Sequence, residues 1–168
     1  MKNFEEIAGE LKTSTVTPEN KDKLSELRSR IDKDKSKEKL VHEAEKYAEG
    51  EGRVAFISEQ EGTTTGFVEI ILDEELPVGA SEISNLNELA HLARIGVTEE
   101  YRGRGIGKKL LAEAEEWAKQ EGKKGMWLDY LTTNDRAQHL YASAGYKDVA
   151  EFTDTSKNKP RRIAVKMF

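Results

Sequence analysis

The stretch TEEYRGRGIGKKLL, residues 98 to 111, constrains the fold more than any other part of the chain. It contains three glycines and four basic side chains, and it follows the strand-like run NELAHLARIGV at 87–97. After it, the apolar residues recur at the spacing of one helix face: Leu110, Leu111, Ala114, Trp117 and Ala118. The pattern therefore predicts a strand, a short glycine loop and a helix in direct succession.

Two common nucleotide-binding loops do not fit this stretch. A Walker A loop needs four residues between its first glycine and its Gly-Lys pair, but only three separate Gly103 from Gly107. A dinucleotide fingerprint needs a third glycine where Leu110 stands. The glycines still let backbone N–H groups approach an anion at a helix N-terminus, and Arg102 and Arg104 add charged donors. The stretch therefore predicts a diphosphate-binding site.

The remainder of the chain predicts an α+β fold. Apolar residues at helical spacing indicate two helices within 17–48, broken near 32–36, and the Thr-Pro pair at 17–18 marks the start of the first. Residues 3–12 leave open a short helix or a first strand at 11–16. Five further runs predict strands (RVAFISEQ, TTTGFVEIIL, GMWLDYL, KDVAEF and RRIAVKMF), and NDRAQHLYASAGY predicts a helix closed by Gly145. This order predicts a mixed, mostly antiparallel sheet flanked by helices on both faces.

Length and composition limit the class of protein. A chain of 168 residues without a Pro/Gly-rich linker predicts a single domain over 1–168, with a helical N-terminal part at 1–50. No run of 18 apolar residues and no signal-peptide pattern occurs, so we expect a cytoplasmic protein that does not contact a membrane. Without cysteine there is no thiol nucleophile or zinc–thiolate site, and we expect no metal.

Charge is unevenly distributed along the sequence. Residues 58–100 contain ten acidic residues and one base, Arg94, whereas residues 101–110 contain four bases and no acid. This asymmetry indicates two ligands of opposite sign, although carboxylates on solvated turns would give the same pattern. The net charge of −5 and the small size of the basic patch disfavour binding to nucleic acid.

Together these motifs resemble those of the GNAT superfamily of N-acetyltransferases. The loop matches the acetyl-CoA signature Arg/Gln-x-x-Gly-x-Gly/Ala at Arg102, Gly105 and Gly107. The second family element appears at the expected distance, as Asn134 followed by LYASAGY. The two cover residues 87–146, which we identify as the cofactor-binding core. The resemblance implies the GNAT fold, in which one strand of the central sheet bulges and splays away from its neighbour.

The resemblance also implies where acetyl-CoA binds. In the family, backbone N–H groups of the splayed strand bind the thioester and pantetheine; by position these belong to Ile95 and Val97, and Gly96 between them is consistent with a bulge. A donor at the acetyl carbonyl would act as an oxyanion hole. Asn134 would bond a pantetheine amide. The pyrophosphate would be held by the backbone of Gly103, Arg104, Gly105, Ile106, Gly107 and Lys108, next to the side chain of Arg102.

Two catalytic roles follow from the same resemblance. Tyr141 matches the tyrosine with which many members protonate the departing CoA thiolate, and its spacing to Gly145 favours this role over the alternative of an aromatic packed on the sheet. Some members place a glutamate eleven residues before the signature, and this count reaches His91. A histidine can relay the proton that an ammonium must lose before attack. A half-buried strand histidine is the structural alternative, and Glu88 and Glu69 are the other candidate bases.

The sequence therefore predicts an N-acetyltransferase that transfers acetyl from acetyl-CoA to a primary amine by direct attack in a ternary complex. The charge asymmetry favours a cationic acceptor: a polyamine, an aminoglycoside, or a lysine or N-terminal amine of a protein. Homodimers are common in the family, so a homodimer is a further expectation. The alternative function is a non-catalytic acyl-CoA-binding sensor or protein-interaction module, which Tyr141 disfavours.

Overall fold

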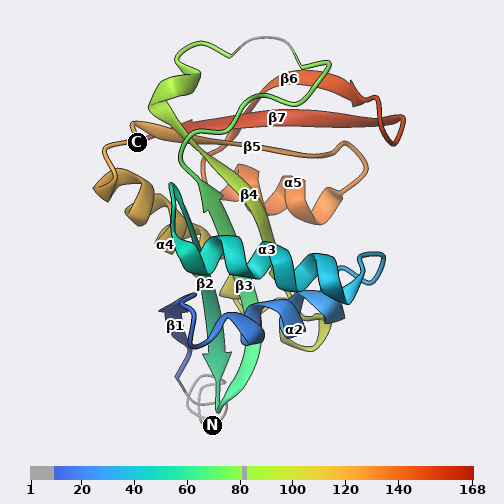
Figure 1. The fold of residues 1–168 in the computed structure, drawn as a ribbon. Coiled ribbons are helices and arrows are strands. Elements are labelled where there is room, and N and C mark those ends of the chain that lie inside the picture. The colour runs from blue at the N-terminus through green and yellow to red at the C-terminus, as the bar shows by residue number, and fades with distance from the viewer. Residues whose placement is uncertain (1–9, 81–82) are drawn as a thin grey trace, which may run out of the picture. The chain divides into compact units, whose positions relative to one another are not determined.

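The structure is a computed structural model that describes residues 10–80 and 83–168. The strands are β1 (Lys12–Thr15), β2 (Arg53–Gln60), β3 (Thr63–Ile71), β4 (Leu89–Val97), β5 (Gly125–Leu131), β6 (Lys147–Asp154) and β7 (Lys159–Met167) (Figure 1). The α-helices are α2 (Lys21–Ile31), α3 (Lys37–Glu49), α4 (Ile106–Gln120) and α5 (Asp135–Ser143), and the short 3₁₀ helices are η1 (Leu86–Glu88) and η2 (Glu99–Tyr101). None of the helices in these two ranges is long and apolar enough to cross a membrane.

The strands hydrogen-bond in the order β1-β2-β3-β4-β5-β7-β6. The β4–β5 pair is parallel, whereas β1–β2, β5–β7 and β6–β7 are antiparallel. The prediction of a mixed, mostly antiparallel sheet is therefore confirmed. The predicted strand at the N-terminal end is β1, while the alternative helix at residues 3–12 falls largely outside the described residues.

The chain forms two compact units that alternate along the sequence. Unit 1 comprises Met1–Ile70 and Arg94–Ala114, and unit 2 comprises Ile71–Ala93 and Glu115–Phe168. Strands β3 and β4 and helix α4 each run from one unit into the other. The predicted single domain over 1–168 stays a prediction.

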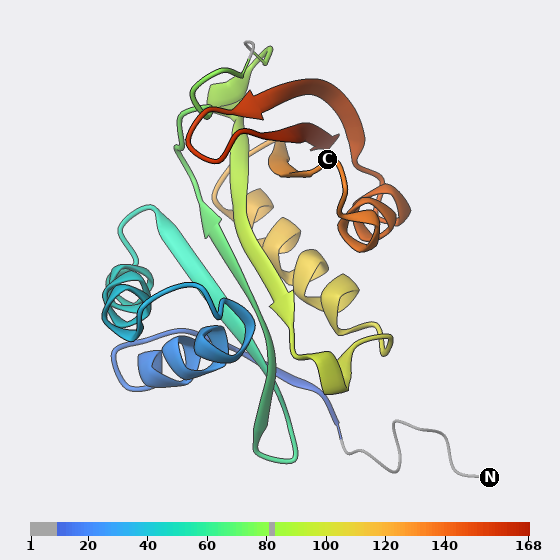
Figure 2. The ribbon, with the colours of Figure 1, turned by 90° about the vertical axis from the view of Figure 1, so that its right-hand side faces the viewer.

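In unit 1, the faces of β3 are covered by different helices. Side chains alternate along a strand, so Gly66 and Phe67 face opposite sides. A Cβ at Gly66 would lie 2.9 Å from Leu110 Cδ1 of α4, while the Phe67 ring lies under the Arg28 guanidinium of α2 at 5.7 Å. Figures 1 and 2 show α2 and α3 side by side along β2 and β3. The missing side chain of Gly66 therefore lets α4 pack closely on the strand.

Side-chain hydrogen bonds to backbone N–H groups lie just before α2 and at the start of α3, and the start predicted for the first helix needs correction. The predicted helix start at Thr17–Pro18 is wrong, because α2 begins at Lys21. The Asn20 side chain accepts a hydrogen bond from the Thr17 N–H at 2.7 Å, which holds these residues in a turn rather than in a helix. Helix α3 begins as expected from capping rules, with the Ser36 side chain accepting from the Lys39 N–H, and it ends at the left-handed Gly50.

In unit 2, an apolar cluster covers one face of the sheet. Leu89, Trp127, Phe152 and Ile163 are buried, and the segment between β3 and β4 packs against them through Leu76, Ala80, Ile83 and Leu86. On the other side, the ring of Tyr141 in α5 lies 5.7 Å from the ring of Tyr130 in β5. Because Trp127 and Tyr130 are three residues apart on one strand, their side chains point to opposite faces.

Candidate active site

The glycine loop lies in unit 1, between β4 and α4. Thr98 fixes its start, since the Thr98 N–H and hydroxyl both donate to the Thr65 carbonyl, at 2.9 and 3.3 Å. Gly103 and Gly105 have φ values of +76° and +81°, a conformation that side chains rarely adopt. A Cβ at either glycine would meet nothing within 4 Å, so both glycines border open space. The loop therefore presents bare backbone to a ligand.

The N-terminus of α4 completes this backbone cradle. The Lys109 N–H donates to the Gly105 carbonyl at 3.1 Å, which is the first turn of the helix. The N–H groups of Ile106, Gly107 and Lys108 precede that bond and have no acceptor within the helix. Such N–H groups and the helix dipole bind anions. Ile106 is 3% exposed and anchors the helix in unit 1, so its side chain is core and only its backbone faces the loop.

Basic side chains border the loop and are partly fixed by it. Arg102 Nε donates to the Val97 carbonyl at 3.1 Å, and Arg104 donates to the Glu100 carbonyl at 3.0 Å while lying over the Tyr101 ring. Lys108 is exposed. Backbone N–H groups at a helix N-terminus thus lie beside guanidinium groups, an arrangement that can bind an anion; the predicted pyrophosphate site stays a prediction.

Strand β4 carries the three residues predicted to bind the thioester and pantetheine. Gly96 lies against Phe67, where an added Cβ would be 2.7 Å from the ring carbon Cε1. The glycine is thus required by a close approach of two strands within unit 1, a reason that the sequence did not reveal. Strand β4 runs from Leu89 to Val97, so Ile95, Gly96 and Val97 are its last three residues.

Pairing between β4 and β5 is short. It runs from Leu89↔Gly125 to His91↔Trp127, whereas β5 pairs with β7 along its whole length, to Leu131↔Arg161. Strand β4 continues for six residues beyond His91. This early end of the pairing agrees with the expected splayed strand; a bulge in β4 stays a prediction.

His91, the first candidate base, lies in unit 2 on the same face as Trp127. Its ring stacks on the indole with centroids 3.8 Å apart and planes inclined by 15°. His91 Nε2 lies 3.7 Å from Asp129 Oδ1, and Asp129 Oδ2 accepts from Arg161 Nε at 2.6 Å. The sequence did not single out Asp129 or Arg161. Alternation along GMWLDYL was the available signal, because it places Asp129 on the face of Trp127.

The two glutamate candidates are engaged elsewhere. Glu88 ends η1 and its carboxylate accepts from Lys124 Nζ at 2.7 Å in unit 2. Glu69 is buried in unit 1, where it accepts from Arg28 Nη1 at 3.0 Å. Burial raises the pKa of Glu69 to about 7, against the opposing effect of Arg28.

Asn134 and Tyr141 lie at the start and near the end of α5. The Asn134 side-chain oxygen caps the helix by accepting from the Ala137 N–H at 3.1 Å, which leaves its amide NH₂ group available as a donor. Tyr141 is 7% exposed and packs between the rings of Tyr130 and Tyr146. Burial, and secondarily the charge of Asp129, raises the pKa of Tyr141 above its usual range.

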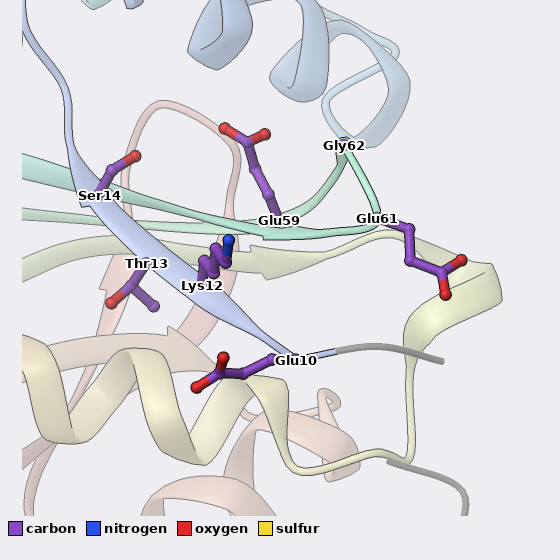
Figure 3. Close-up of a pocket in the computed structure, with 7 residues that line it drawn as sticks. All are labelled: Glu10, Lys12, Thr13, Ser14, Glu59, Glu61 and Gly62. Atoms are coloured by element: carbon purple, nitrogen blue, oxygen red, sulfur yellow. The ribbon is translucent and has the colours of Figure 1, made fainter. Parts of the chain in front are cut away.

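Four of the ten acids of the 58–100 segment are paired with a base of their own unit. Lys23, Arg28, Lys123 and Lys124 contact Glu59, Glu69, Asp73 and Glu88, at 2.7–3.0 Å. Glu59 and Glu61, with Glu10 and Lys12, line a pocket of about 430 Å³ beside β1 in unit 1 (Figure 3). None of the predicted site residues lines this pocket. No group of three or more His, Asp or Glu side chains in residues 10–80 and 83–168 is arranged to hold a metal ion.

Comparison with known proteins gives a consistent family. A model of the acetyltransferase (GNAT) family matches residues 22–146. Streptothricin acetyltransferase A of Bacillus subtilis is 31% identical over 122 residues, which are 73% of this chain and 64% of that protein. The chain spans between 32% and 64% of the length of the curated relatives it matches.

Solved structures share the fold at low identity. The aminoglycoside N-acetyltransferase AAC(6')-Iy in complex with CoA superimposes with a TM-score of 0.74 and 18% identity, over 84% of this chain and 90% of that chain. A putative streptothricin acetyltransferase from Bacillus anthracis str. Ames, in complex with acetyl coenzyme A, gives a TM-score of 0.62 and 22% identity over 74% and 67% of the two chains. At these identities the likeness concerns the fold.

Proposed function

The chain belongs to the acetyltransferase (GNAT) family, and we propose that it is an acetyl-CoA-dependent N-acetyltransferase whose acceptor is a small cationic primary amine. The observation that carries the proposal is the cradle of unit 1, where two left-handed glycines border open space immediately before the N-terminus of α4. Bound acetyl-CoA would supply the activated acetyl thioester. The amine would attack it directly, with both substrates bound.

Backbone groups of unit 1 would hold the cofactor. The N–H groups from Gly103 to Lys108 would donate to the pyrophosphate, with Arg102 beside them. On β4, the N–H groups of Ile95 and Val97 would orient the thioester and the pantetheine arm. The Asn134 amide would donate to pantetheine through its NH₂ group, since its oxygen already caps α5.

His91 would act as the base. A primary ammonium has a pKa of about 10 and must lose a proton before its nitrogen can attack. His91 has two ring nitrogens without a hydrogen-bond partner in the described residues, whereas Glu88 is paired with Lys124 and Glu69 with Arg28. These contacts favour the histidine over both glutamates as the proton acceptor.

Tyr141 would act as the acid. Because burial raises the pKa of its hydroxyl, the side chain stays protonated across the pH range in which the enzyme would work, and it can donate a proton to the departing thiolate. Its ring packs on Tyr130, whose side chain points away from the face that carries Trp127 and His91. Acid and base would thus act from the two faces of the sheet.

The acceptor class rests on relatives rather than on surface charge. Streptothricin acetyltransferase A and the aminoglycoside N-acetyltransferase are named for cationic antibiotics that carry amines. The acidic segment before the loop contributes less than its sequence indicated, since four of its carboxylates are paired with Lys or Arg. A protein lysine or N-terminus stays the alternative acceptor.

The test is release of CoA thiol from acetyl-CoA against a panel of streptothricin-type and aminoglycoside antibiotics, polyamines, lysine-containing peptides and neutral amines. We expect turnover with cationic small amines and none in the Gly105→Asp variant. Faster acetylation of neutral amines would contradict the cationic acceptor. Tight binding of acetyl-CoA without turnover on any amine would instead favour a non-catalytic acyl-CoA sensor.

A further inference from the structure

One face of the sheet in unit 2 carries a line of three interacting side chains from three strands. His91 of β4 lies 3.7 Å from Asp129 of β5 through Nε2 and Oδ1. Asp129 in turn accepts from Arg161 of β7, at 2.6 Å between Oδ2 and Nε. Trp127, two residues before Asp129 on β5, stacks on the His91 ring. The imidazole is therefore held by an aromatic plane on one side and faces a carboxylate at one edge.

The carboxylate of Asp129 is held in its ionised form. Burial alone would oppose the charge, but His91 and Arg161 together keep the pKa of Asp129 below its usual range. An ionised carboxylate can only accept hydrogen bonds. Asp129 therefore presents a permanent negative charge and an acceptor to the Nε2 edge of His91.

The nitrogens of His91 have no other partner in the described part of the chain. Both Nδ1 and Nε2 are buried, and neither makes a hydrogen bond. The 3.7 Å separation from Asp129 is too long for a hydrogen bond but is within ion-pair distance. A proton on Nε2 would face the carboxylate favourably, whereas a lone pair there would face it unfavourably. The favoured neutral ring thus carries its proton on Nε2 and its lone pair on Nδ1.

We propose that Asp129 is a positioning residue that keeps the His91 proton on Nε2, makes Nδ1 the basic nitrogen, and stabilises the imidazolium formed when the buried Nδ1 receives the proton of the acceptor ammonium through a relay rather than by direct contact. The inference rests on the proposed function for its catalytic meaning. In the step, one proton passes from the ammonium to Nδ1, leaving a neutral amine and a His91 cation. Asp129 stays ionised throughout, and the Trp127 ring adds a cation–π contact to the charged imidazole.

Other charged side chains lie on the elements of unit 2 that form this face or pack against it, and several of them are paired. Arg161 of β7 contacts Asp129 itself. The Lys124–Glu88 pair lies at the start of β4, and the Lys123–Asp73 pair joins the α4–β5 turn to the segment after β3. In both pairs the positive charge of the lysine is balanced by the negative charge of its carboxylate partner. Asp129 is therefore the carboxylate whose removal should change the protonation of His91.

The first test reads the tautomer of His91 directly and does not require turnover. Nitrogen-15 NMR of the three histidines, with His91 identified by its loss in His91→Gln, should show Nε2 protonated in the neutral ring. In Asp129→Asn, we expect the signal to move toward a mixture of both tautomers. Nδ1 protonation in the wild type, or an unchanged spectrum in Asp129→Asn, would overturn the inference.

The second test reads the rate of acetylation. Loss of the carboxylate removes the group that fixes the proton of His91 and stabilises its cation. We expect Asp129→Asn to lower kcat more than tenfold while KM for acetyl-CoA stays within twofold. Asp129→Glu, which keeps the charge, should restore kcat in part. An unchanged kcat in a folded Asp129→Asn variant would overturn the role.

Asp148→Asn is the matched control, because Asp148 accepts from the Tyr130 hydroxyl at 2.8 Å on β6 and lies away from His91. We expect it to leave both the tautomer of His91 and kcat unchanged; effects equal to those of Asp129→Asn would mean a general loss of charge and contradict the proposal. If no amine is acetylated, the proposed function fails while the NMR measurement still decides the position of the proton.

Discussion

The buried guanidinium of Arg28 donates to the buried carboxylate of Glu69 at 3.0 Å, joining α2 to β3 within unit 1. Glu43 of α3 and Asp32 at the end of α2 contact the same guanidinium, at 2.6 and 3.0 Å. One arginine thus ties two helices, α2 and α3, to strand β3, which also contacts Gly96 through Phe67. Removing one partner of such a buried pair is costly, because the remaining charge has no water to replace it.

This contact predicts a pH dependence of stability. Burial raises the pKa of Glu69 from 4.5 to about 7, so the folded protein favours the protonated acid. The resulting stability is fully present below pH 4.5 and is lost as the pH rises to about 7, with a change of at most about 3 kcal/mol. Urea unfolding at several pH values should show this slope in the wild type and not in Glu69→Gln. Glu59→Gln, at the more exposed pair with Lys23, should keep it; an equal slope in Glu69→Gln would contradict the assignment.

The cofactor cradle predicts that a carboxylate at Gly105 abolishes binding of acetyl-CoA. Gly105→Asp adds a negative charge to open space beside the first N–H groups of α4 and forces a side chain into a left-handed conformation. Gly122→Asp is its matched control, since Gly122 has φ +84° and equally open surroundings at the other end of α4. By calorimetry we expect more than a hundredfold weaker binding in Gly105→Asp only. Equal losses in both variants would attribute the effect to backbone strain.

Asn134 has two separable tasks. Its oxygen caps α5, and its NH₂ group is the predicted donor to pantetheine. Asn134→Asp keeps a capping oxygen but loses the donor, so we expect an unchanged melting temperature and a several-fold higher KM for acetyl-CoA. Asn134→Ala should raise KM similarly and also lose about 1 kcal/mol of stability. An unchanged KM for acetyl-CoA in Asn134→Asp would exclude the contact with pantetheine and would mean that Asn134 serves only as the cap of α5.

Tyr141→Phe tests the acid. The ring packing on Tyr130 and Tyr146 is retained, so acetyl-CoA should bind within twofold of the wild type, while kcat falls by about tenfold or more. Tyr146→Phe is the neighbouring control and should keep kcat. Steady-state kinetics with the best amine of the panel gives both values. Equal kcat in Tyr141→Phe and wild type would remove the tyrosine from the mechanism.

The local order of elements could be predicted from the sequence, because strand, loop and helix signals lie next to one another in the chain. The glycine loop and the helix α4 that follows it needed no long-range information. Contacts between distant residues could not be predicted in this way. Arg28 meets Glu69 across 41 residues, and Asp129 meets Arg161 across 32, with no periodic pattern to join either pair.

The distribution of charge along the sequence was the poorest guide to the functional site. The acids of the 58–100 segment suggested an acceptor site, but folding brings Lys23, Lys123 and Lys124 onto three of them from other elements. The helix start at Thr17–Pro18 was predicted wrongly for a related reason. The Asn20 side chain accepts a hydrogen bond from the Thr17 N–H and holds residues 17–20 in a turn. This local bond competes with helix formation, and a rule based on the position of proline alone does not take it into account.

The alternation of the two units along the chain limits how this protein can be divided. Each unit is assembled from two separate stretches, so a fragment that stops after Ile70 lacks Arg94–Ala114 and, with it, the glycine loop. Exchange of either unit between relatives requires two simultaneous replacements joined within β3, β4 and α4. Recombination at a single point therefore cannot exchange a whole unit between two relatives.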